Sequence, residues 1–470
     1  MRLGFLILGL AACTEFADPN ERADAAVDAA DAGEDAPADA GVDVVDASDC
    51  IVPPEGCPPL CARESVTLGA PLETRERIIV GEVVLDCEHL YDLGTITYVE
   101  PGATLTIQPG VVVQARTMGA LVVQAGGRLV AEGTAEEPVV FTSLNEEAGS
   151  WAGVVMLGRA LVSTGDSFPG ENGSMLLDPL GGSEADPNER ASFGGDDPGH
   201  DCGSLRYTRI EYAGALNRFF IPEEIPGLTL AGCGDKTRLD YVQVHASRDE
   251  ATNFIGGGFP VRHIVTSEAR SDALQWNRGW TGSLQYAVAH LAFADANGNA
   301  VEGRIAAFPF PDLGPAVANV TMVIPFRGGT QGAMYLTAGS GMRAYNMLSY
   351  GSSFGLTVFS STRGNPGFFN REFFTLEYSI VDDDVPFTAD SDVGERVDPP
   401  NRGNRSADPG LSRALLVDDL VNPNFQPSPL SAANEGAAPA AELPSELEPT
   451  TYIGAIDPNG EDWTAGWTRY

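Results

Sequence analysis

The stretch ALVVQAGGRLVAEGTAEEPVVFTS, residues 120–143, contains three runs of aliphatic and β-branched residues separated by glycine-containing corners. Such runs predict three short strands, because branched side chains favour extended backbone and glycine permits tight turns. The corners are too short to contain a helix. The fold must therefore place many short strands one after another with close turns between them.

The spacing of similar segments indicates a repeat of about 22 residues that is interrupted by insertions. NFIGGG (253–258) aligns with QWNRGW (275–280) at 22 residues, and the strands that follow them match at 23. RIEYAG (209–214) aligns with YVQVHA (241–246) at 32. This repeat predicts an all-β, right-handed parallel β-helix whose turns stack about 4.8 Å apart. The competing fold, a β-sandwich, would need hairpin turns, which are scarce here.

The N-terminus predicts export and lipid attachment. Arg2 is followed by the apolar run LGFLILGL (3–10) and by LAAC (10–13), which matches a bacterial lipobox. Residues 1–12 are then the signal peptide and Cys13 is the lipidated residue. The apolar run is too short to span a bilayer. We therefore expect a protein that is lipid-anchored to a bacterial outer membrane and displayed at the cell surface.

The charge balance restricts the partners of the protein. The 470-residue chain contains 66 acidic and 28 basic residues, for a net charge of -38. Such a charge repels the phosphates of nucleic acids, so we expect no nucleic-acid partner. Acidic residues are densest within residues 13–49, where Asp and Glu alternate with Ala, Gly, Val and Pro. This composition predicts a disordered linker between the lipid and the folded domain.

Six cysteines besides Cys13 predict disulfides formed in an oxidising compartment. Cys202 and Cys233 each open a segment of similar character, and adjacent turns of a coil would bring them together. We therefore expect these two to form a disulfide. The pairing stays open among the other four, which are Cys50, Cys57, Cys61 and Cys87.

The rest of the chain divides into three parts. Residues 50–95 are rich in cysteine and residues 96–382 carry the β-helix pattern, whereas residues 383–470 are rich in proline. The two ends of a strand stack would expose unpaired backbone groups unless they were covered. We therefore expect residues 50–95 to form an N-terminal cap and residues 383–470 to form a C-terminal cover.

The chain resembles a family of bacterial surface lipoproteins after about residue 95. The resemblance is carried by GATLTIQPGVVV (102–113), LRYTRIEYAG (205–214), WNRGWTGS (276–283) and YIGAIDPNGEDWTAGW (452–467). It implies a right-handed parallel β-helix with the pectin-lyase-like fold, in proteins of mostly unassigned function. In this family acidic residues usually precede the aromatic residue before the glycine corner, whereas this chain has Asn253 and Gln275 there.

Two groups of carboxylates are the candidates for catalysis. Asp249, Glu250 and Asp272 would share one face of the coil if the 22-residue alignment holds, and a lyase would use carboxylates with Ca²⁺ and a nearby arginine. The same charges on neighbouring turns could instead form structural ion pairs. GGDDPGHDCG (194–203) also places carboxylates beside His200, but it has the composition of an acidic surface loop.

A third segment is a candidate calcium site. ADANGNAVEG (294–303) contains four residues with oxygen-bearing side chains, namely Asp295, Asn297, Asn299 and Glu302. An EF-hand is excluded because Ala300 and Ala306 stand at the positions that need Gly and Glu. The segment predicts either a structural Ca²⁺ site or a turn held by Asx hydrogen bonds.

Paired tryptophans form the remaining motif. WNRGWT, which begins at Trp276 and includes Trp280, recurs near the C-terminus as WTAGWT (463–468). Exposed tryptophans stack on sugar rings, so Trp276 and Trp280 are candidates for glycan binding. Buried tryptophans would instead serve as core or as a capping plug.

Taken together, these features favour a surface-displayed lipoprotein that acts as a non-catalytic binding or adhesion scaffold. The expected partners are the membrane, through the lipid anchor, and a polysaccharide or a surface protein. Calcium is the only cofactor for which the sequence offers a candidate site. The alternatives are a polysaccharide lyase or glycoside hydrolase on the same fold, and a structural envelope protein without a ligand.

Overall fold

The computed structural model describes most of the chain from residue 57 onward. The described residues are 57–72, 76–117, 119–163, 175–176, 189–214, 225–292, 298–303, 314–325, 332–336, 341–352, 354–358, 374–382, 385–388, 402–416 and 423–470. Every described residue belongs to one compact unit, which spans residues 50–470. The described residues contain no helix that is long and apolar enough to cross a membrane.

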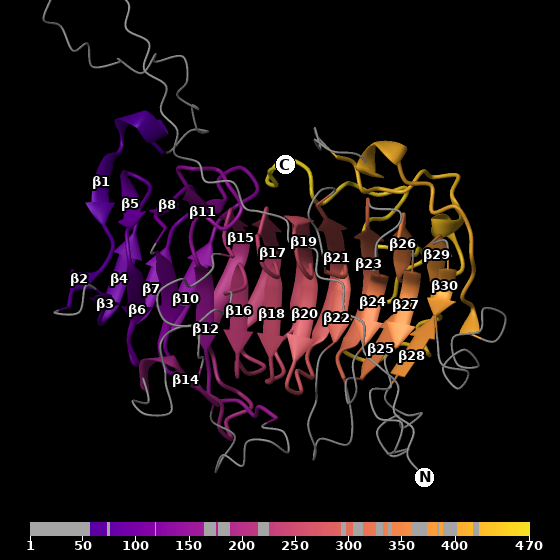
Figure 1. Cartoon of the computed structure of the whole chain (residues 1–470), viewed down its shortest axis with the longest axis horizontal. Coiled ribbons are helices and arrows are strands. Elements are labelled where there is room, and N and C mark those ends of the chain that lie inside the picture. The colour runs from indigo at the N-terminus through magenta and orange to yellow at the C-terminus, as the bar shows by residue number, and fades with distance from the viewer. Residues whose placement is uncertain are drawn as a thin grey trace, which may run out of the picture. The chain divides into compact units, whose positions relative to one another are not determined.

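The regular secondary structure of the described residues is nearly all β-strand, arranged in two large sheets (Figure 1). The short-strand sheet has 12 strands: β2 (Ala70–Pro71), β3 (Arg77–Ile79), β6 (Ile96–Val99), β9 (Ala120–Val123), β12 (Gly153–Leu157), β16 (Leu228–Ala231), β18 (Thr252–Ile255), β20 (Leu274–Asn277), β22 (Val301–Gly303), β24 (Gly332–Leu336), β27 (Phe354–Val358) and β30 (Val385–Thr388).

The long-strand sheet has 16 strands: β1 (Glu64–Thr67), β4 (Glu82–Leu85), β5 (His89–Leu93), β7 (Thr104–Ile107), β8 (Val112–Ala115), β10 (Arg128–Glu132), β11 (Val139–Ser143), β15 (Gly203–Glu211), β17 (Arg238–His245), β19 (Val261–Ala269), β21 (Ser283–Leu291), β23 (Ala316–Val323), β25 (Met342–Tyr345), β26 (Leu348–Tyr350), β28 (Phe374–Glu377) and β29 (Ile380–Asp382). A small antiparallel pair, β13 (Met175–Leu176) with β14 (Ser192–Phe193), stands apart from both sheets.

Short 3-10 helices complete the described secondary structure. They are Leu60–Ala62, Glu189–Ala191, Arg413–Leu416 and Ala432–Asn434.

Successive turns of the coil visit the two sheets in a fixed order. The chain passes from a strand of the short-strand sheet to one or two strands of the long-strand sheet and then returns, as in β6, β7, β8 and β9. Neighbouring strands within each large sheet are parallel, apart from β2 with β3. Because consecutive strands lie in different sheets while stacked strands pair in parallel, the fold is a parallel β-helix, as the sequence predicts.

The register confirms most of the predicted repeat. The opening stretch forms β9, β10 and β11. Phe254 pairs with Trp276 at 22 residues, and Arg262 pairs with Gln285 at 23. The alignment at 32 is wrong, because Arg209 pairs with Gln243 and the spacing is 34. An insertion separates these two strands, and the local pattern does not show where the strand resumes after it.

Bends in the long strands come from residues with left-handed backbone. Tyr207, Tyr241 and His263 have φ of 43°, 56° and 45°, and the strand ladder omits each of them. This conformation is uncommon for residues other than glycine and turns the chain sharply. Each long strand therefore covers two sides of the coil, and its left-handed residue marks the corner between them.

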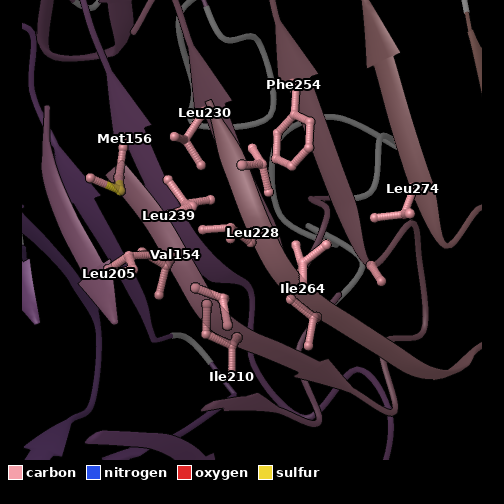
Figure 2. Close-up of a cluster of buried hydrophobic side chains, with 14 of the residues drawn as sticks. Val154, Met156, Leu205, Ile210, Leu228, Leu230, Leu239, Phe254, Ile264 and Leu274 are labelled. Carbon is pink, nitrogen blue, oxygen red and sulfur yellow. The ribbon is translucent and has the colours of Figure 1, made fainter. Parts of the chain in front are cut away.

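The core fills the space between the two sheets. Figure 2 shows Val154, Met156, Leu228 and Leu230 from the short-strand sheet facing the interior together with Leu205 from the long-strand sheet. Each of these five side chains is at most 1% exposed. At about 25 cal/mol per Å² of apolar surface removed from water, this burial is the main stabilising contribution to the coil.

Disulfides hold neighbouring segments of the coil together. Cys202 and Cys233 form a disulfide with a Cα–Cα distance of 5.8 Å, which confirms the predicted pair. A second disulfide joins Cys57 to Cys87 with a Cα–Cα distance of 5.5 Å. Cys50 lies outside the described residues, as does the candidate lipidation site Cys13. These bonds fit a protein that folds in an oxidising compartment.

Parallel stacking includes strands at both ends of the repeat. Within residues 50–95, β4 pairs in parallel with β7, and β3 pairs in parallel with β6. Within residues 383–470, β30 pairs in parallel with β27. Both predicted covering segments therefore contribute strands to the coil itself.

The C-terminal segment, described at residues 402–416 and 423–470, packs on the outside of the long-strand sheet. Phe425, Ile453 and Trp467 belong to one buried cluster with Val265 and Val288, which lie on β19 and β21. The backbone of the segment is also bound by side chains of the coil. Gln243 donates to the carbonyl of Arg469 (2.6 Å) and accepts from its N–H (2.8 Å). The segment thus covers an apolar outer face of the coil.

Candidate functional site

The predicted carboxylates lie at corners that precede strands of the short-strand sheet. Asp249 and Glu250 precede β18, and Asp272 precedes β20. Thr252 pairs with Leu274 in the parallel register, so the corners before these two strands are stacked on each other. The structure therefore brings Glu250 and Asp272 to neighbouring turns, as the 22-residue alignment predicts.

An amide joins these carboxylates from turn to turn. Nε2 of Gln275 donates to Oε1 of Glu250 (3.0 Å) and to Oδ2 of Asp272 (2.9 Å). Oδ1 of Asp272 accepts from the backbone N–H of Asn299 (2.6 Å), and Nδ2 of Asn299 donates to Oε2 of Glu302 (2.9 Å). We call these five residues, Glu250, Asp272, Gln275, Asn299 and Glu302, the corner ladder.

Burial restricts what the corner ladder can do chemically. Asp272 is 1% exposed, Glu302 is 4% exposed and Asp249 is 6% exposed. A general acid or base has to come within hydrogen-bond distance of the substrate, and a carboxylate that is almost entirely covered cannot do so without a rearrangement. Amide donors stabilise the buried carboxylates of the ladder instead. Arg248 and Arg270, the arginines that stand beside these carboxylates in the sequence, are exposed at the surface.

The calcium candidate is only partly described. Asp295 and Asn297 lie outside the described residues. Oδ1 of Asn299 accepts from the backbone N–H of Gly332 (3.0 Å), and Oε2 of Glu302 accepts from Nδ2 of Asn299. These two residues are therefore engaged in the corner ladder. The residues that the structure describes include no group of three or more His, Cys, Asp or Glu arranged to hold a metal ion.

The tryptophan pair lies in the core. Trp276 and Trp280 are 3% and 1% exposed, and the Trp280 ring packs against the rings of Phe254 (5.0 Å) and Phe259 (5.6 Å). Gly279 has a φ of 79°, a left-handed conformation that places the second indole in the core. The indoles offer no face to a sugar ring, so the glycan-stacking expectation is replaced by a packing role.

The loop at 194–203 is held by hydrogen bonds within itself and to neighbouring segments, and by an ion pair with Arg128. Oδ1 of Asp201 accepts from the N–H of Gly203 (2.8 Å), and its Oδ2 lies 2.7 Å from Nη2 of Arg128. His200 is 8% exposed, and burial lowers its pKa. These contacts order the loop around the Cys202–Cys233 disulfide.

Sequence reasoning missed a buried charged cluster beneath the C-terminal segment. Glu211 is fully buried, with its carboxylate 3.0 Å from Nε of Arg209 and 3.4 Å from Nη1 of Arg469. Burial lowers the pKa of nearby His245 to about 3, with a further contribution from the two arginines. The proline-rich composition and the repeated aromatic motif of the C-terminal segment predicted a cover or plug, but neither indicated that charged residues lie beneath it.

Comparison with known proteins agrees with the parallel β-helix fold of the structure. A family model described as pectate-lyase like β-helix domain matches residues 77–402, which is more than half of the chain. No curated protein and no solved structure matches the chain significantly. The match covers the strands from β3 to β30, which are the turns of the coil. The chain therefore belongs to the family of pectate-lyase-like β-helix domains.

Proposed function

We propose that this protein is an exported, lipid-anchored β-helix that acts as a non-catalytic binding or adhesion scaffold for glycan or protein partners. The corner ladder is the observation that supports this most directly. Two of its carboxylates, Glu250 and Asp272, are among those that the sequence offered for catalysis, and Glu302 was offered as a calcium ligand. Asp272 and Glu302 are buried and bonded to amides. The role that fits these residues best is to hold successive turns of the coil in register.

The proposed location rests on three features. The lipobox ending at Cys13 supplies the anchor, and the acidic segment that follows it supplies a tether. The two disulfides favour an oxidising compartment. A stack of similar turns offers long, repetitive faces, which is how solenoid proteins bind extended partners.

A binding assay tests the function. The purified full-length chain would be incubated with plant, algal and bacterial polysaccharides, with and without Ca²⁺, and mass spectrometry would record both retained glycan and shortened products. We expect retention without shortening. New reducing ends or unsaturated uronates that vanish in Asp272→Asn, and persist in the surface control Asp235→Asn, would replace the scaffold with a lyase or hydrolase.

The same assay separates the remaining alternatives. Retention that needs Ca²⁺ would assign a cation to the binding site. Absence of both retention and cleavage would argue against a glycan partner and favour a protein partner or a structural role. For the anchor, Cys13→Ser should move the protein from the membrane fraction to the soluble fraction, and an unchanged distribution would overturn lipid attachment.

A further inference from the structure

A cavity of 470 Å³ lies where three successive turns leave the short-strand sheet. Glu100 follows β6, Gln124 follows β9, and Arg159 lies two residues after β12. Arg190 and the strand β14, which contains Ser192 and Phe193, form the opposite wall. The volume falls within the range of about 300–1,000 Å³ that is usual for small-molecule sites.

Each guanidinium in this cavity is held in a different way. Nη1 of Arg190 lies 3.1 Å from Oε1 of Glu100, and its Cζ lies 5.3 Å from the ring centroid of Tyr98. The carbonyl of Arg190 also accepts from Nε2 of Gln124 (3.0 Å). Arg190 and Glu100 therefore neutralise each other and form a rigid part of the wall.

Arg159 is positioned by its backbone and by one backbone carbonyl. Its Nη2 donates to the carbonyl of Ala125 (2.8 Å), and its own carbonyl accepts from the N–H of Asp197 (2.9 Å). Among the described residues, no carboxylate forms an ion pair with Arg159. A guanidinium has five N–H donors, so most of its donors are available to a ligand. The cavity therefore has one surplus positive charge in a protein of net charge -38.

We propose that this cavity binds a small ligand through a single carboxylate, with Arg159 as the charged contact. A planar guanidinium binds a planar carboxylate through two parallel hydrogen bonds. Ser192 also lines the cavity and can bond a second polar group of the ligand, and Pro101 and Ala125 provide apolar surface. One surplus positive charge neutralises one carboxylate, so the site disfavours a ligand with two negative charges, such as phosphate.

The inference is independent of the proposed scaffold function. An extended partner would lie along the faces of many turns, whereas this cavity takes a small molecule. Loss of carboxylate binding would leave the polysaccharide result unchanged, and failure of polysaccharide binding would leave this site unchanged.

Calorimetry on the full chain tests the site with paired probes. Glucuronate should bind and glucose should not, because the two sugars differ at the carboxylate. Lactate distinguishes two classes of carboxylate ligand, sugar acids and other organic acids. Its binding would show that the site accepts both classes. Raising the NaCl concentration from about 0.05 M to about 0.5 M should weaken binding, because salt screens a partly exposed charge.

Arg159→Gln should weaken glucuronate binding by about tenfold or more, because it removes a charge-assisted hydrogen bond. Arg238→Gln is the matched control, since Arg238 is also exposed and also donates to backbone carbonyls but does not line the cavity. Circular dichroism and thermal unfolding would check that both variants fold. Absence of carboxylate binding, equal losses in both variants or a preference for phosphate would each overturn the proposal.

Discussion

Asp272 shows how the coil accommodates a buried carboxylate by means of hydrogen bonds. Its carboxylate is 1% exposed and accepts from the Gln275 side chain at one oxygen and from the Asn299 backbone at the other. A buried carboxylate without such donors would be strongly unfavourable. The hydrogen bonds therefore satisfy both carboxylate oxygens of Asp272 and tie its corner to the next turn.

Replacing Asp272 by alanine should lower the free energy of unfolding by about 2–4 kcal/mol. The change removes hydrogen bonds to a buried carboxylate, leaves the backbone N–H of Asn299 without its acceptor and leaves Gln275 with Glu250 alone. Guanidinium-induced unfolding followed by circular dichroism would measure the loss. Asp235→Ala, at an exposed corner, should change stability by no more than about 0.5 kcal/mol. If the two variants were equally stable, the corner ladder would contribute nothing to the coil.

At the scale of elements, the C-terminal segment is joined to the coil by aromatic packing. The rings of Tyr207, Tyr241 and His263 are stacked at centroid distances of 4.4 and 4.3 Å, on corners of successive turns. The Trp467 ring meets the first two edge-on at 5.7 and 6.2 Å. Left-handed backbone at each corner brings the rings into one column, and the column forms the surface on which the segment packs.

Trp467→Ala should detach the end of this segment. Trp467 is 1% exposed, and truncation of a buried aromatic side chain costs about 3–5 kcal/mol. Amide hydrogen exchange should become faster at residues 457–470, while the strands of the coil keep their protection. Leu430→Ala is the control within the same segment, because Leu430 is 97% exposed. Unchanged exchange in Trp467→Ala would show that hydrogen bonds alone hold the segment.

At the scale of the whole molecule, two buried histidines make the stability of the fold depend on pH. Burial lowers the pKa of His245 to about 3 and that of His290 to about 4, well below the ordinary value near 6.5. The unfolded chain therefore binds more protons than the folded protein between these values, so stability rises with pH across that window. The stabilisation is complete above about pH 6.5 and is lost as the pH falls towards 4 and 3.

Acid unfolding measures how strongly these two histidines make the stability depend on pH. The melting temperature should fall steeply between about pH 6.5 and pH 4, and the double variant His245→Gln with His290→Gln should show a shallower fall. His89→Gln serves as the control, because its side chain is 37% exposed. Identical slopes in the wild type and the double variant would assign the acid sensitivity to other groups, such as His200 or the carboxylates.

The sequence by itself determined the features that depend on local pattern. Branched residues and glycine corners predict β9, β10 and β11, and the 22-residue spacing predicts that Phe254 stacks on Trp276. The predicted disulfide between Cys202 and Cys233 follows from the same repeat. These predictions succeed because each turn of a solenoid contacts chiefly its neighbours, so a repeat in sequence becomes a contact in space.

Only the tertiary structure decided what depends on packing between distant segments. An insertion hid the spacing of 34 between Arg209 and Gln243, and burial of Trp276 is set by the rings around it. Arg159 and Arg190 line the same cavity although they lie in separate segments of the sequence. A local pattern encodes extended backbone and turns, whereas the exposure and partners of a side chain depend on which remote segment covers it.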